Sequence, residues 1–523
     1  MFTEPVTGKD FFGRAKILEV LSKRVDALKS GYRQNVALTG KMLSGKSSIL
    51  HHFLECLKDT SIVPIYIEVV DEPFPSFANK FIGTLLYNFF KSENIHLPKD
   101  MDCLINKGEE VIPRTIELIR EIRVDLANRI YNRVYRKLLD LTSVLKEETH
   151  KSCVVMLDEF HNLENFRIKN VFLLLGKIIM IQKNTMYIVS SSQRNKIRKI
   201  LSEKLSLLFG NFEIMEVSSF GSKTAKLFLK EKISPIHMSE YYSDYISNLT
   251  DRNPFYLDVI SKKIKVLAEA SGILRVNIEL IKDVFRDILY APTGTINQHF
   301  TNNIHFLLDR KLRKQYLGIL FALAQGAGKI KDISSFFNGK VRGLSKKLDF
   351  LINIDLVFKC GVFYKIQDRL FEFWLRIVYF KKENILIDTP HERANEFKEL
   401  VENDVENYLI EYNKGVLERL RDLFHSFNGE IVEINRKLRK LQKFIKIEVL
   451  KYGGDKNYLT CEKSDRYWVC QIKYNRTEEN DIIDFIQEKD KRIKTAKRLI
   501  LIPLNGIDST ALLLAKEKHI WVW

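Results

Sequence analysis

We expect an α/β fold built on a parallel sheet, because three apolar runs of this chain each end in a polar loop. The run at 35–39 leads into a glycine-framed loop and then into a helical pattern at 48–55. The run at 152–157 ends in Asp158-Glu159, and the run at 186–189 ends in Ser190-Ser191-Ser192. Further apolar runs at 62–68 and 212–217 complete the expected sheet.

Residues 40–47 read Gly-Lys-Met-Leu-Ser-Gly-Lys-Ser, the GxxxxGKS pattern of a phosphate-binding loop. The glycines allow backbone N–H groups to turn toward an anion, and the following helix adds the positive end of its dipole. We expect Lys46 to reach the β- and γ-phosphates and the Ser47 hydroxyl to hold Mg²⁺. A chance glycine-rich turn is the alternative, and the flanking strand and helix disfavour it. The expected nucleotide contacts in this region are Gly40, Lys41, Met42, Leu43, Ser44, Gly45, Lys46, Ser47 and Ser48.

Two acids follow the strand at 152–157, about 110 residues after the loop. Asp158 is expected to orient the Mg²⁺ shell, together with Ser47, and Glu159 to polarise the attacking water. The serines at 190–192 leave a strand at the sheet edge where ligands collect, so a hydroxyl there is expected to contact the γ-phosphate or the water. The alternative is that these serines only cap the next helix. Lys46, Glu159 and Ser192 are therefore the catalytic candidates.

Composition points to several domains and an anionic partner. A chain of 523 residues exceeds one hydrophobic core, and its formal net charge is +18. Residues 309–347 hold ten basic and two acidic side chains. No run of ~18 apolar residues is present, so we expect no membrane contact and a cytoplasmic location. The six cysteines form no CxxC pair, which favours reduced structural thiols.

The basic region lies in a pattern of three helices and a hairpin. Helical patterns at 314–324, 333–337 and 341–351 precede short strands at 356–359 and 362–366. This order predicts a winged helix, whose third helix enters a DNA major groove in such folds. Lys340, Arg342, Lys346 and Lys347 fit phosphate contacts. A winged helix used for domain packing, with solvated charges, is the alternative.

The C-terminal part changes to helix, three strands, helix and strand, which is the core of restriction-endonuclease-like folds. Asp455 and Gln471-x-Lys473 resemble the D…(E/Q)xK signature of that superfamily, and the arrangement is similar to Mrr-like nucleases. Residues two apart on a strand share a face, so Gln471 and Lys473 are expected at one site. Asp455 and Gln471 would ligate Mg²⁺, Lys473 would steady the phosphate or the water, and Glu402 or Glu406 would add a carboxylate. Glutamine in place of an acid leaves this site one negative charge short, so a fold kept without catalysis remains open.

A family resemblance covers most of the chain. Phe11-Phe12-Gly13-Arg14 resembles the opening motif of the archaeal-type ATPase family, a branch of the STAND/AAA+ phosphate-loop NTPases, and the loop, acid and serine motifs follow in that family's order. Residues 253–257 (Asn-Pro-Phe-Tyr-Leu) resemble its lid motif, which implies that Pro254 approaches the nucleotide. Residues 367–374 resemble the family's junction to its C-terminal domain.

Two positions depart from that family's pattern. Arg252 stands where glycine usually precedes the Asn-Pro pair, and Asn211 stands where an arginine is usual in the segment at 205–211. A transition-state arginine therefore cannot be assigned at 211. Arg194 and Arg198 are candidate substitutes, and we expect surface positions for both.

The sequence therefore predicts a phosphate-loop ATPase core at 1–220, a helical lid at 221–300, a winged helix at 301–380 and a restriction-endonuclease-like domain at 381–523. The expected function is a switch that binds and hydrolyses Mg-ATP and binds DNA. One alternative is a signalling or assembly module whose inactive tail binds a protein partner. Another is a Mg²⁺-dependent DNA nuclease, and a homo-oligomer remains an open possibility.

Overall fold

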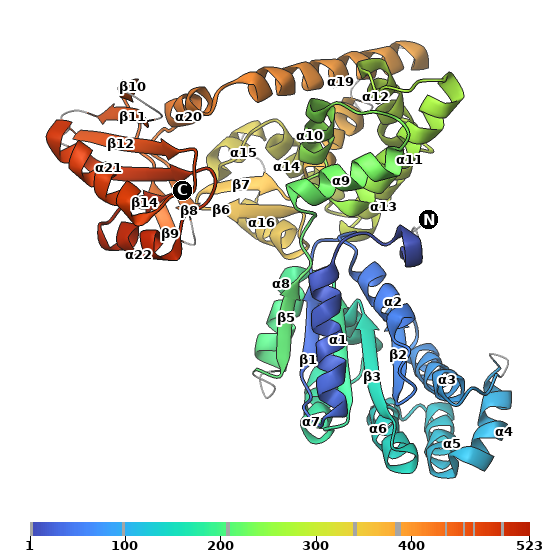
Figure 1. Ribbon diagram of the computed structural model, residues 1–523. Coiled ribbons are helices and arrows are strands. Elements are labelled where there is room, and N and C mark those ends of the chain that lie inside the picture. The colour runs from blue at the N-terminus through green and yellow to red at the C-terminus, as the bar shows by residue number, and fades with distance from the viewer. Residues whose placement is uncertain are drawn as a thin grey trace. The chain divides into compact units, whose positions relative to one another are not determined.

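The structure is a computed structural model in which the chain forms two compact units. It describes residues 4–96, 100–205, 210–337, 342–381, 389–434, 437–452, 456–463, 466–492 and 496–523 (Figure 1). The first unit comprises Met1–Arg310, Lys346–Leu356 and Gln367–Trp374. The second comprises Lys311–Ser345, Val357–Ile366 and Leu375–Trp523.

A five-stranded parallel sheet in the order β2-β3-β4-β1-β5 forms the centre of the first unit. Its strands are β1 (Asn35–Thr39), β2 (Ile62–Glu68), β3 (Ser152–Asp158), β4 (Thr185–Ser191) and β5 (Phe212–Glu216). The strands β1, β3 and β4 are buried along their whole length, as expected where helices cover both faces of a parallel sheet. The five predicted strands are all present, and β4 extends two residues further than predicted, through Ser191.

Helices cover the sheet on both sides (Figure 1). Alternate strand residues point to opposite faces, so the sheet contributes to two separate cores. The first core contains Val36, Leu38 and Met156 and is closed by α1 (Ala15–Lys29) and α2 (Lys46–Cys56). The second contains Ala37, Val155 and Val189. It is closed by α3 (Phe74–Ser92), α4 (Met101–Val111), α5 (Pro113–Ala127), α6 (Tyr131–Thr149) and α7 (Val171–Ile181).

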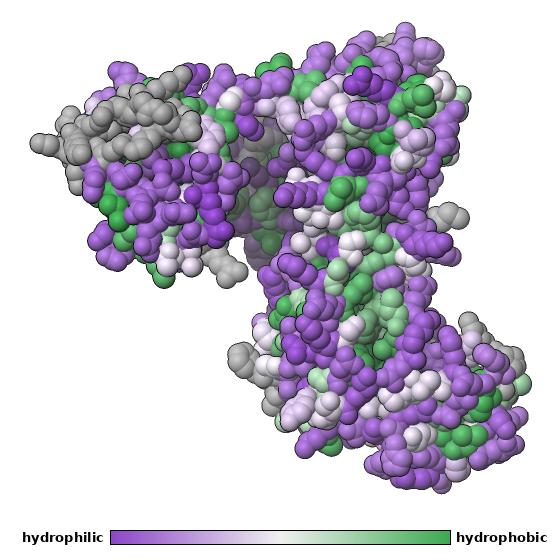
Figure 2. Space-filling view, in the orientation of Figure 1, coloured by the Kyte–Doolittle hydropathy of each residue, from purple (hydrophilic) through white to green (hydrophobic). Residues whose placement is uncertain are grey.

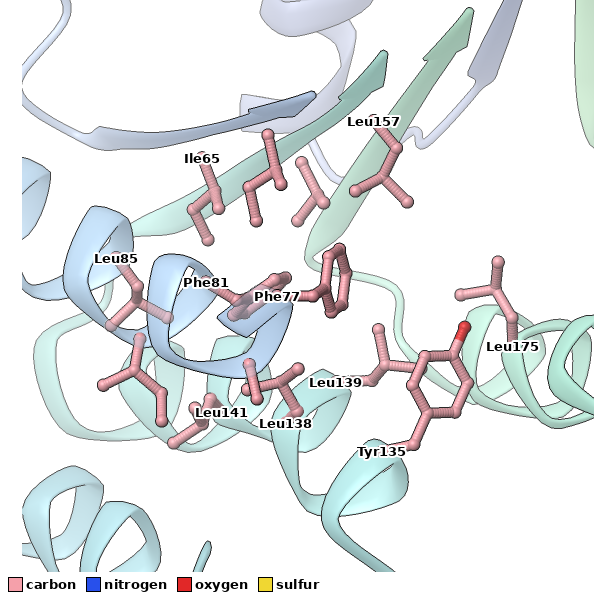
Figure 3. Packing of buried hydrophobic residues seen from close by; sticks show 14 of the residues in the cluster. Ile65, Phe77, Phe81, Leu85, Tyr135, Leu138, Leu139, Leu141, Leu157 and Leu175 are labelled. Carbon is pink, nitrogen blue, oxygen red and sulfur yellow. The ribbon is translucent and has the colours of Figure 1, made fainter. Parts of the chain in front are cut away.

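The second core shows why the long helical insertion packs on the sheet. Phe77, Phe81 and Leu85 recur at helical spacing along α3 and are all fully buried, within 1 % exposure. They meet Ile65 of β2 and Leu138 of α6 in a common apolar layer (Figure 3). The helices within residues 73–149 therefore pack against the sheet through this apolar layer.

The rest of the first unit is a helical lid and two returning segments. The lid contains α9 (Ser222–Ile233), α10 (Glu240–Leu249), α11 (Pro254–Ser271), α12 (Ile278–Phe285) and α13 (Thr295–Leu307). Short helical turns lie at Gly8–Asp10, Phe160–Phe166, Arg194–Lys199 (α8), Ile200–Lys204 and Arg286–Tyr290. The returning segments contribute the end of α16 (Leu344–Asn353) and α17 (Arg369–Trp374). The Trp374 indole N–H donates to Asn297 Oδ1 at 3.0 Å, which ties α17 to α13.

The second unit contains α14 (Arg313–Ala324), α15 (Ile330–Phe336) and the antiparallel hairpin β6 (Val357–Cys360) and β7 (Phe363–Ile366). A helical turn (Leu375–Tyr379), α19 (Pro390–Asn413) and α20 (Val416–His425) lead to a hairpin of β8 (Ile431–Ile434) and β9 (Lys437–Lys440), which the sequence analysis did not predict. A second sheet has the order β10-β11-β12-β13-β14. Its strands are β10 (Lys446–Tyr452), β11 (Lys456–Lys463), β12 (Arg466–Lys473), β13 (Ala496–Pro503) and β14 (Trp521–Val522). Helix α21 (Glu479–Arg492) connects β12 to β13, and α22 (Ser509–Glu517) connects β13 to β14.

The surface and the thiols agree with the composition. The face seen in Figure 2 is largely hydrophilic, with hydrophobic residues in small groups. None of the helices that the structure describes is both long and apolar enough to span a bilayer. The six cysteines, 56, 103, 153, 360, 461 and 470, are all free, as predicted. Burial raises the pKa of the Cys461 thiol to about 12, which keeps it protonated and unreactive.

Candidate functional site

The loop at 40–47 has a backbone that only its glycines permit. A β-carbon on Gly40 would lie 2.4 Å from the Val217 carbonyl oxygen, so no larger residue fits there. Gly45 has φ of +92° immediately before α2, a conformation that glycine adopts without strain. Leu43 also has a positive φ, of 60°, which is uncommon for a residue with a side chain. The loop is therefore held in one specific shape between β1 and α2.

Lys46 is the first residue of α2 and is only 4 % exposed. Its Nζ donates to the carbonyl oxygens of Gly40 at 3.3 Å and Lys41 at 3.0 Å. Burial lowers the pKa of this ammonium, and the carboxylates of Glu159 and Asp158 act in the opposite direction. In the described part of the chain the lysine forms no ion pair, so its charge is balanced only by dipoles and by acids at longer range. The Ser44 hydroxyl of the same loop is buried with no hydrogen-bond partner.

Asp158 lies at the end of β3, opposite the loop, and is 1 % exposed. Its carboxylate accepts hydrogen bonds from the Tyr66 hydroxyl, at 3.1 Å, and from the Ser190 hydroxyl. Burial, followed by the charge of Asp158, raises the pKa of Tyr66, so this phenol stays a donor. Tyr66 and Ser190 come from the two strands that flank β3, and together they fix the orientation of the acid.

Glu159 follows with φ of 50°, which turns its side chain toward the end of β4. Its Oε2 accepts from the Ser192 backbone N–H at 3.0 Å and from the Ser192 hydroxyl at 2.9 Å. His161 Nδ1 lies 3.3 Å from the same oxygen and 2.9 Å from the Ser191 hydroxyl. Burial raises the pKa of Glu159 and lowers that of His161 to about 4, so the imidazole is neutral at physiological pH. The structure thus brings Lys46, Asp158, Glu159 and Ser190–Ser192 to one edge of the sheet, where the sequence placed them.

The lid begins beside the loop. Pro254 Cγ would lie 3.9 Å from a β-carbon built on Gly45, and the Asn253 amide approaches the Met42 carbonyl oxygen at 3.5 Å. Asn253 Oδ1 caps α11 by accepting from the Phe255 N–H at 3.0 Å. Arg252, the departure from the family pattern, has φ of 55°. This left-handed conformation is the physical reason for a glycine there, and the arginine adopts it at some cost in strain.

Two polar contacts join the loop and the lid to the returning segment at 367–374. Lys41 Nζ forms an ion pair with Asp251 at 2.6 Å and donates to the Gln367 carbonyl at 3.3 Å. The Tyr256 hydroxyl donates to Asp368 Oδ2 at 2.6 Å, and Asp368 Oδ1 accepts from the Phe371 N–H at 3.0 Å. Burial raises the pKa of the Asp368 carboxyl, while these hydrogen bonds lower it.

Arg194 is partly exposed, where the sequence predicts a surface position. Its side chain is 21 % exposed, and its backbone N–H donates to Asp355 Oδ2 at 3.0 Å. Arg198, at 57 % side-chain exposure, does lie on the surface. The two differ because Ile352 and Asp355, at and after the end of α16, contact the start of α8 from 157 and 161 residues away in the chain, and no local pattern reveals such contacts.

Some predicted positions fall outside the described residues. These are Asp455 of the nuclease-like signature, Lys340, and residues 206–209 of the segment that ends at Asn211. Gln471 and Lys473 do share a face of β12. The Gln471 amide donates to Tyr458 at 3.1 Å, its Oε1 is buried without a partner, and Lys473 pairs with Asp481 at 2.6 Å. Glu402 and Glu406 lie on α19, where Phe397, Val401 and Val405 are the buried residues. Within the described ranges no three His, Cys, Asp or Glu side chains form a metal-binding group.

Five residues around the loop and the two acids were not found from the sequence: Tyr66, His161, Asp251, Asp355 and Asp368. Tyr66 sits on a strand whose neighbours were predicted, so the parallel order could have suggested it. Asp251 precedes a recognised motif. Asp355 and Asp368 lie more than 300 residues from the loop, and no sequence signal places them there.

Comparison with known proteins supports the fold. No protein-family model matches the chain, and no curated protein is similar to it in sequence. Among solved structures, the Walker-type ATPase of Pyrococcus abyssi is 19 % identical with a TM-score of 0.51, over 72 % of this chain and 99 % of that chain. The Aeropyrum pernix ORC2 protein in ADPNP–ADP complexes is 14 % identical with a TM-score of 0.44, over 78 % of this chain and 98 % of that chain. The fold is therefore that of a phosphate-loop NTPase, an α/β architecture with a five-stranded parallel sheet.

The contact between Tyr256 and Asp368 should stabilise the first unit. Tyr256→Phe removes the hydroxyl and leaves a buried carboxylate with one partner fewer, which costs about 1–3 kcal/mol. We expect a lower midpoint of urea unfolding for this variant. Tyr241→Phe, on the neighbouring helix, is the matched control and should unfold as the wild type does. Equal midpoints for Tyr256→Phe and the wild type would show that the bond contributes no stability.

Proposed function

We propose that this protein is an ATP-binding and ATP-hydrolysing switch of the AAA+/STAND type. The observation that supports this most directly is the buried ammonium of Lys46, which only carbonyl oxygens contact in a glycine-framed loop. A buried charge without an ionic partner is costly, and a triphosphate in the loop would supply that partner. The orphaned Ser44 hydroxyl and the lack of room for a side chain at Gly40 fit a loop that closes around an anion.

The surrounding residues fit Mg-ATP. Ser47 and Asp158 would hold the magnesium, which when bound with the nucleotide neutralises charge on the β- and γ-phosphates. The nucleotide contacts would come from the loop residues 40–47, from Ser48 at the start of α2 and from Pro254 on the lid. Ser190 is already committed to Asp158, so we assign it the orientation of that acid rather than a direct phosphate contact.

Glu159 is the general base of the proposed reaction. Water attacks the γ-phosphorus, the bond to the β-γ bridging oxygen breaks, and the proton of the water passes to the Glu159 carboxylate. Burial raises the pKa of this carboxyl, which strengthens it as a base. Ser192 and His161 hold the carboxylate by three contacts, so their role is to position it.

Nucleotide binding and turnover should respond differently to the two charged residues. Lys46→Ala should weaken ATP binding about tenfold or more, because it removes a charge-assisted contact to phosphate. Glu159→Gln should keep binding and lower turnover by about 10²-fold. Titration with a fluorescent ATP analogue and a phosphate-release assay measure the two effects.

The controls for this test lie on the exposed side of α2 and just beyond it. Glu55→Gln and Lys58→Ala make the same chemical changes at exposed positions and should behave as the wild type. Wild-type turnover in both Lys46→Ala and Glu159→Gln would remove the assignment as an ATPase.

We further propose that the region at 301–380 contains a winged helix that binds DNA. Its helices and hairpin occur in the predicted order, α14, α15, α16, β6 and β7. Arg310, Lys314, Lys331 and Lys346 are exposed, while Lys329 is already paired with Glu430 at 2.7 Å. Exposed cations that are not engaged in the protein are available to phosphates. The alternative partner of this region is another protein.

Binding to duplex DNA should weaken as salt rises, since phosphate contacts release counterions. Lys314→Ala and Lys346→Ala should each lower the affinity and reduce the slope of log K against log salt by about one. Lys16→Ala and Lys223→Ala, exposed lysines on α1 and α9, are the controls and should leave both quantities unchanged. Binding that is absent, or that does not depend on salt, would favour the protein partner.

A second candidate function concerns the tail at 381–523, which we propose to have a restriction-endonuclease-like fold. Three antiparallel strands, β10 to β12, continue into β13, which is parallel to β12 and follows α21. The specific observation that favours Mg²⁺-dependent cleavage is the buried Gln471 Oε1, an oxygen donor with no partner, two residues from Lys473. Gln471 would hold the metal together with Asp455. A tail that contacts DNA or protein without cutting is the competing interpretation.

Cleavage of duplex DNA should require Mg²⁺ and should be abolished in Lys473→Ala. Lys497→Ala, an exposed lysine on the adjacent strand β13, is the matched control and should cut normally. Gel analysis of plasmid and linear DNA, with and without Mg²⁺, measures cleavage by the wild type and by the two variants. Cutting that persists in Lys473→Ala would disprove this active site, and intact DNA with the wild type would support the tail as a contact domain only.

A further inference from the structure

We propose that Arg439 and Arg498 of the tail bind the phosphodiester backbone of a nucleic acid. They lie on the face of the tail sheet that is opposite to Gln471 and Lys473. This site adds a second nucleic-acid contact to the proposed winged helix, and it depends neither on that winged helix nor on cleavage by the tail. All of its residues belong to the second unit.

The two guanidinium groups share one aromatic ring. The Cζ atoms of Arg498 and Arg439 lie 4.2 Å and 4.3 Å from the centroid of the Trp521 ring. An indole ring attracts a cation over its face but does not neutralise its charge. Two like charges over one ring repel each other, and burial, followed by the charge of Arg439, lowers the pKa of Arg498. An anion that contacts both groups would therefore stabilise this arrangement.

The described part of the tail does not supply that anion. Among the residues that the structure describes, neither arginine forms an ion pair, and the buried Arg498 Nε has no hydrogen-bond partner. A guanidinium that stacks on a ring keeps its N–H donors in its own plane, where two of them match two oxygen atoms of a phosphate. Because the two cations occupy the Trp521 ring, we expect contacts to the backbone of the nucleic acid rather than stacking on its bases.

Three strands of the tail sheet hold the ring and Arg498 in position. Trp521, on β14, packs edge-on against Trp468 of β12 with 5.3 Å between the ring centroids, and Trp523 stacks beside it at 6.2 Å. Trp468 is 5 % exposed and is the neighbour of Arg498 in the register of β12 and β13. The aromatic cluster therefore orders the cations before a ligand binds, which lowers the entropy that binding costs.

This site is separate from the residues proposed for cleavage. Side chains alternate along β12, so Trp468 and Cys470 point to one face of the sheet, and Gln471 and Lys473 do not share that face with Cys470 and Trp468 as a set of cleavage residues would. Trp468 and Cys470 belong to one apolar core of the tail, and Val469 belongs to the other. Gln471 lies on the Val469 side. A substitution at the arginines should therefore leave the opposite face intact.

Arg439 comes from the hairpin of β8 and β9, which also contacts the hairpin of β6 and β7. The Val362 N–H, in the turn between β6 and β7, donates to the Ile431 carbonyl of β8 at 3.2 Å. Lys440 lies opposite Ile431 in the β8–β9 pair, and Lys440 and Lys443 are both exposed. Several cations near one another favour a polyanion over a single small anion, because each phosphate contact releases counterions. The charge of this surface therefore fits a nucleic acid.

The test measures binding of the full chain to a fluorescently labelled DNA duplex of mixed sequence. Arg439→Gln and Arg498→Gln should each lower the affinity about five- to tenfold and reduce the slope of log K against log salt by about one. Arg439→Lys keeps the charge but lacks the planar fork, so it should retain part of the affinity. Arg419→Gln makes the same chemical change at an exposed position of α20 and should bind as the wild type does.

Intrinsic fluorescence tests the site in the unchanged protein. Three of the four tryptophans of the chain lie in this cluster, so their emission reports on a phosphate that binds there. Titration with the unlabelled duplex should change the emission of the wild type. Most of that change should be lost in Trp521→Phe, which keeps an aromatic ring beneath the two cations.

Two outcomes would overturn the proposal. One is wild-type affinity for the duplex in the double variant Arg439→Gln/Arg498→Gln. The other is a tryptophan emission that the duplex leaves unchanged, and a response to poly-glutamate alone would then indicate an acidic protein partner. Weaker binding in the arginine variants, with Lys314→Ala and Lys346→Ala at the wild-type affinity, would support the tail site and remove the winged helix as the DNA contact.

Discussion

The burial of one ammonium, that of Lys46, constrains the arrangement of the first unit. Burial of this charge at 4 % exposure destabilises the fold unless the surrounding backbone supplies oxygen atoms and the nearby strands supply acids. Gly40 and Gly45 allow the loop to turn its carbonyls toward the lysine, and β3 delivers Asp158 and Glu159 to the same edge. Each acid is in turn held by a serine hydroxyl: Asp158 by Ser190 in β4, and Glu159 by Ser192 just after β4. The site thus consists of one buried ammonium and two carboxylates, and the parallel sheet determines where they lie.

Polar contacts also connect the loop to the lid and to the returning segment at 367–374. Lys41, in the loop, contacts both Asp251 of the lid and the Gln367 carbonyl, while Tyr256 reaches Asp368. Three parts of the chain that are distant in sequence therefore meet through polar contacts, of which that between Lys41 and Asp251 is partly exposed. Buried hydrogen-bonding groups stabilise the fold only when their partners are in place, so these contacts constrain how the three parts pack. Arg194 and Asp355 form a further polar contact between distant segments.

The charged residues of the second unit have a different role from the charged residues around Lys46. Lys329 and Glu430 form an ion pair within the second unit, whereas Lys314 and Lys331 are exposed and contribute to the positive surface potential. The tail sheet carries its own polar feature, the orphaned Gln471 oxygen, on the same face of β12 as Val469. A loop with the phosphate-binding pattern, a basic region and a buried polar group in the tail are thus present in one chain.

The sequence by itself determined the parallel sheet, the loop at 40–47, the acids at 158–159 and the serines at 190–192. These features are local: a strand, a turn and a helix start are encoded by neighbouring residues, and parallel strands must deliver their carboxyl ends to one edge. Only the tertiary structure decided three hydrogen bonds: from Ser192 to Glu159, from Tyr256 to Asp368, and from the Arg194 backbone N–H to Asp355. These contacts join segments separated by 33, 112 and 161 residues, and no hydrophobic period or turn signal specifies which distant polar side chains will meet. The sequence did not predict the contact of Asp355 with Arg194 for that reason, because the two residues belong to segments far apart in the chain.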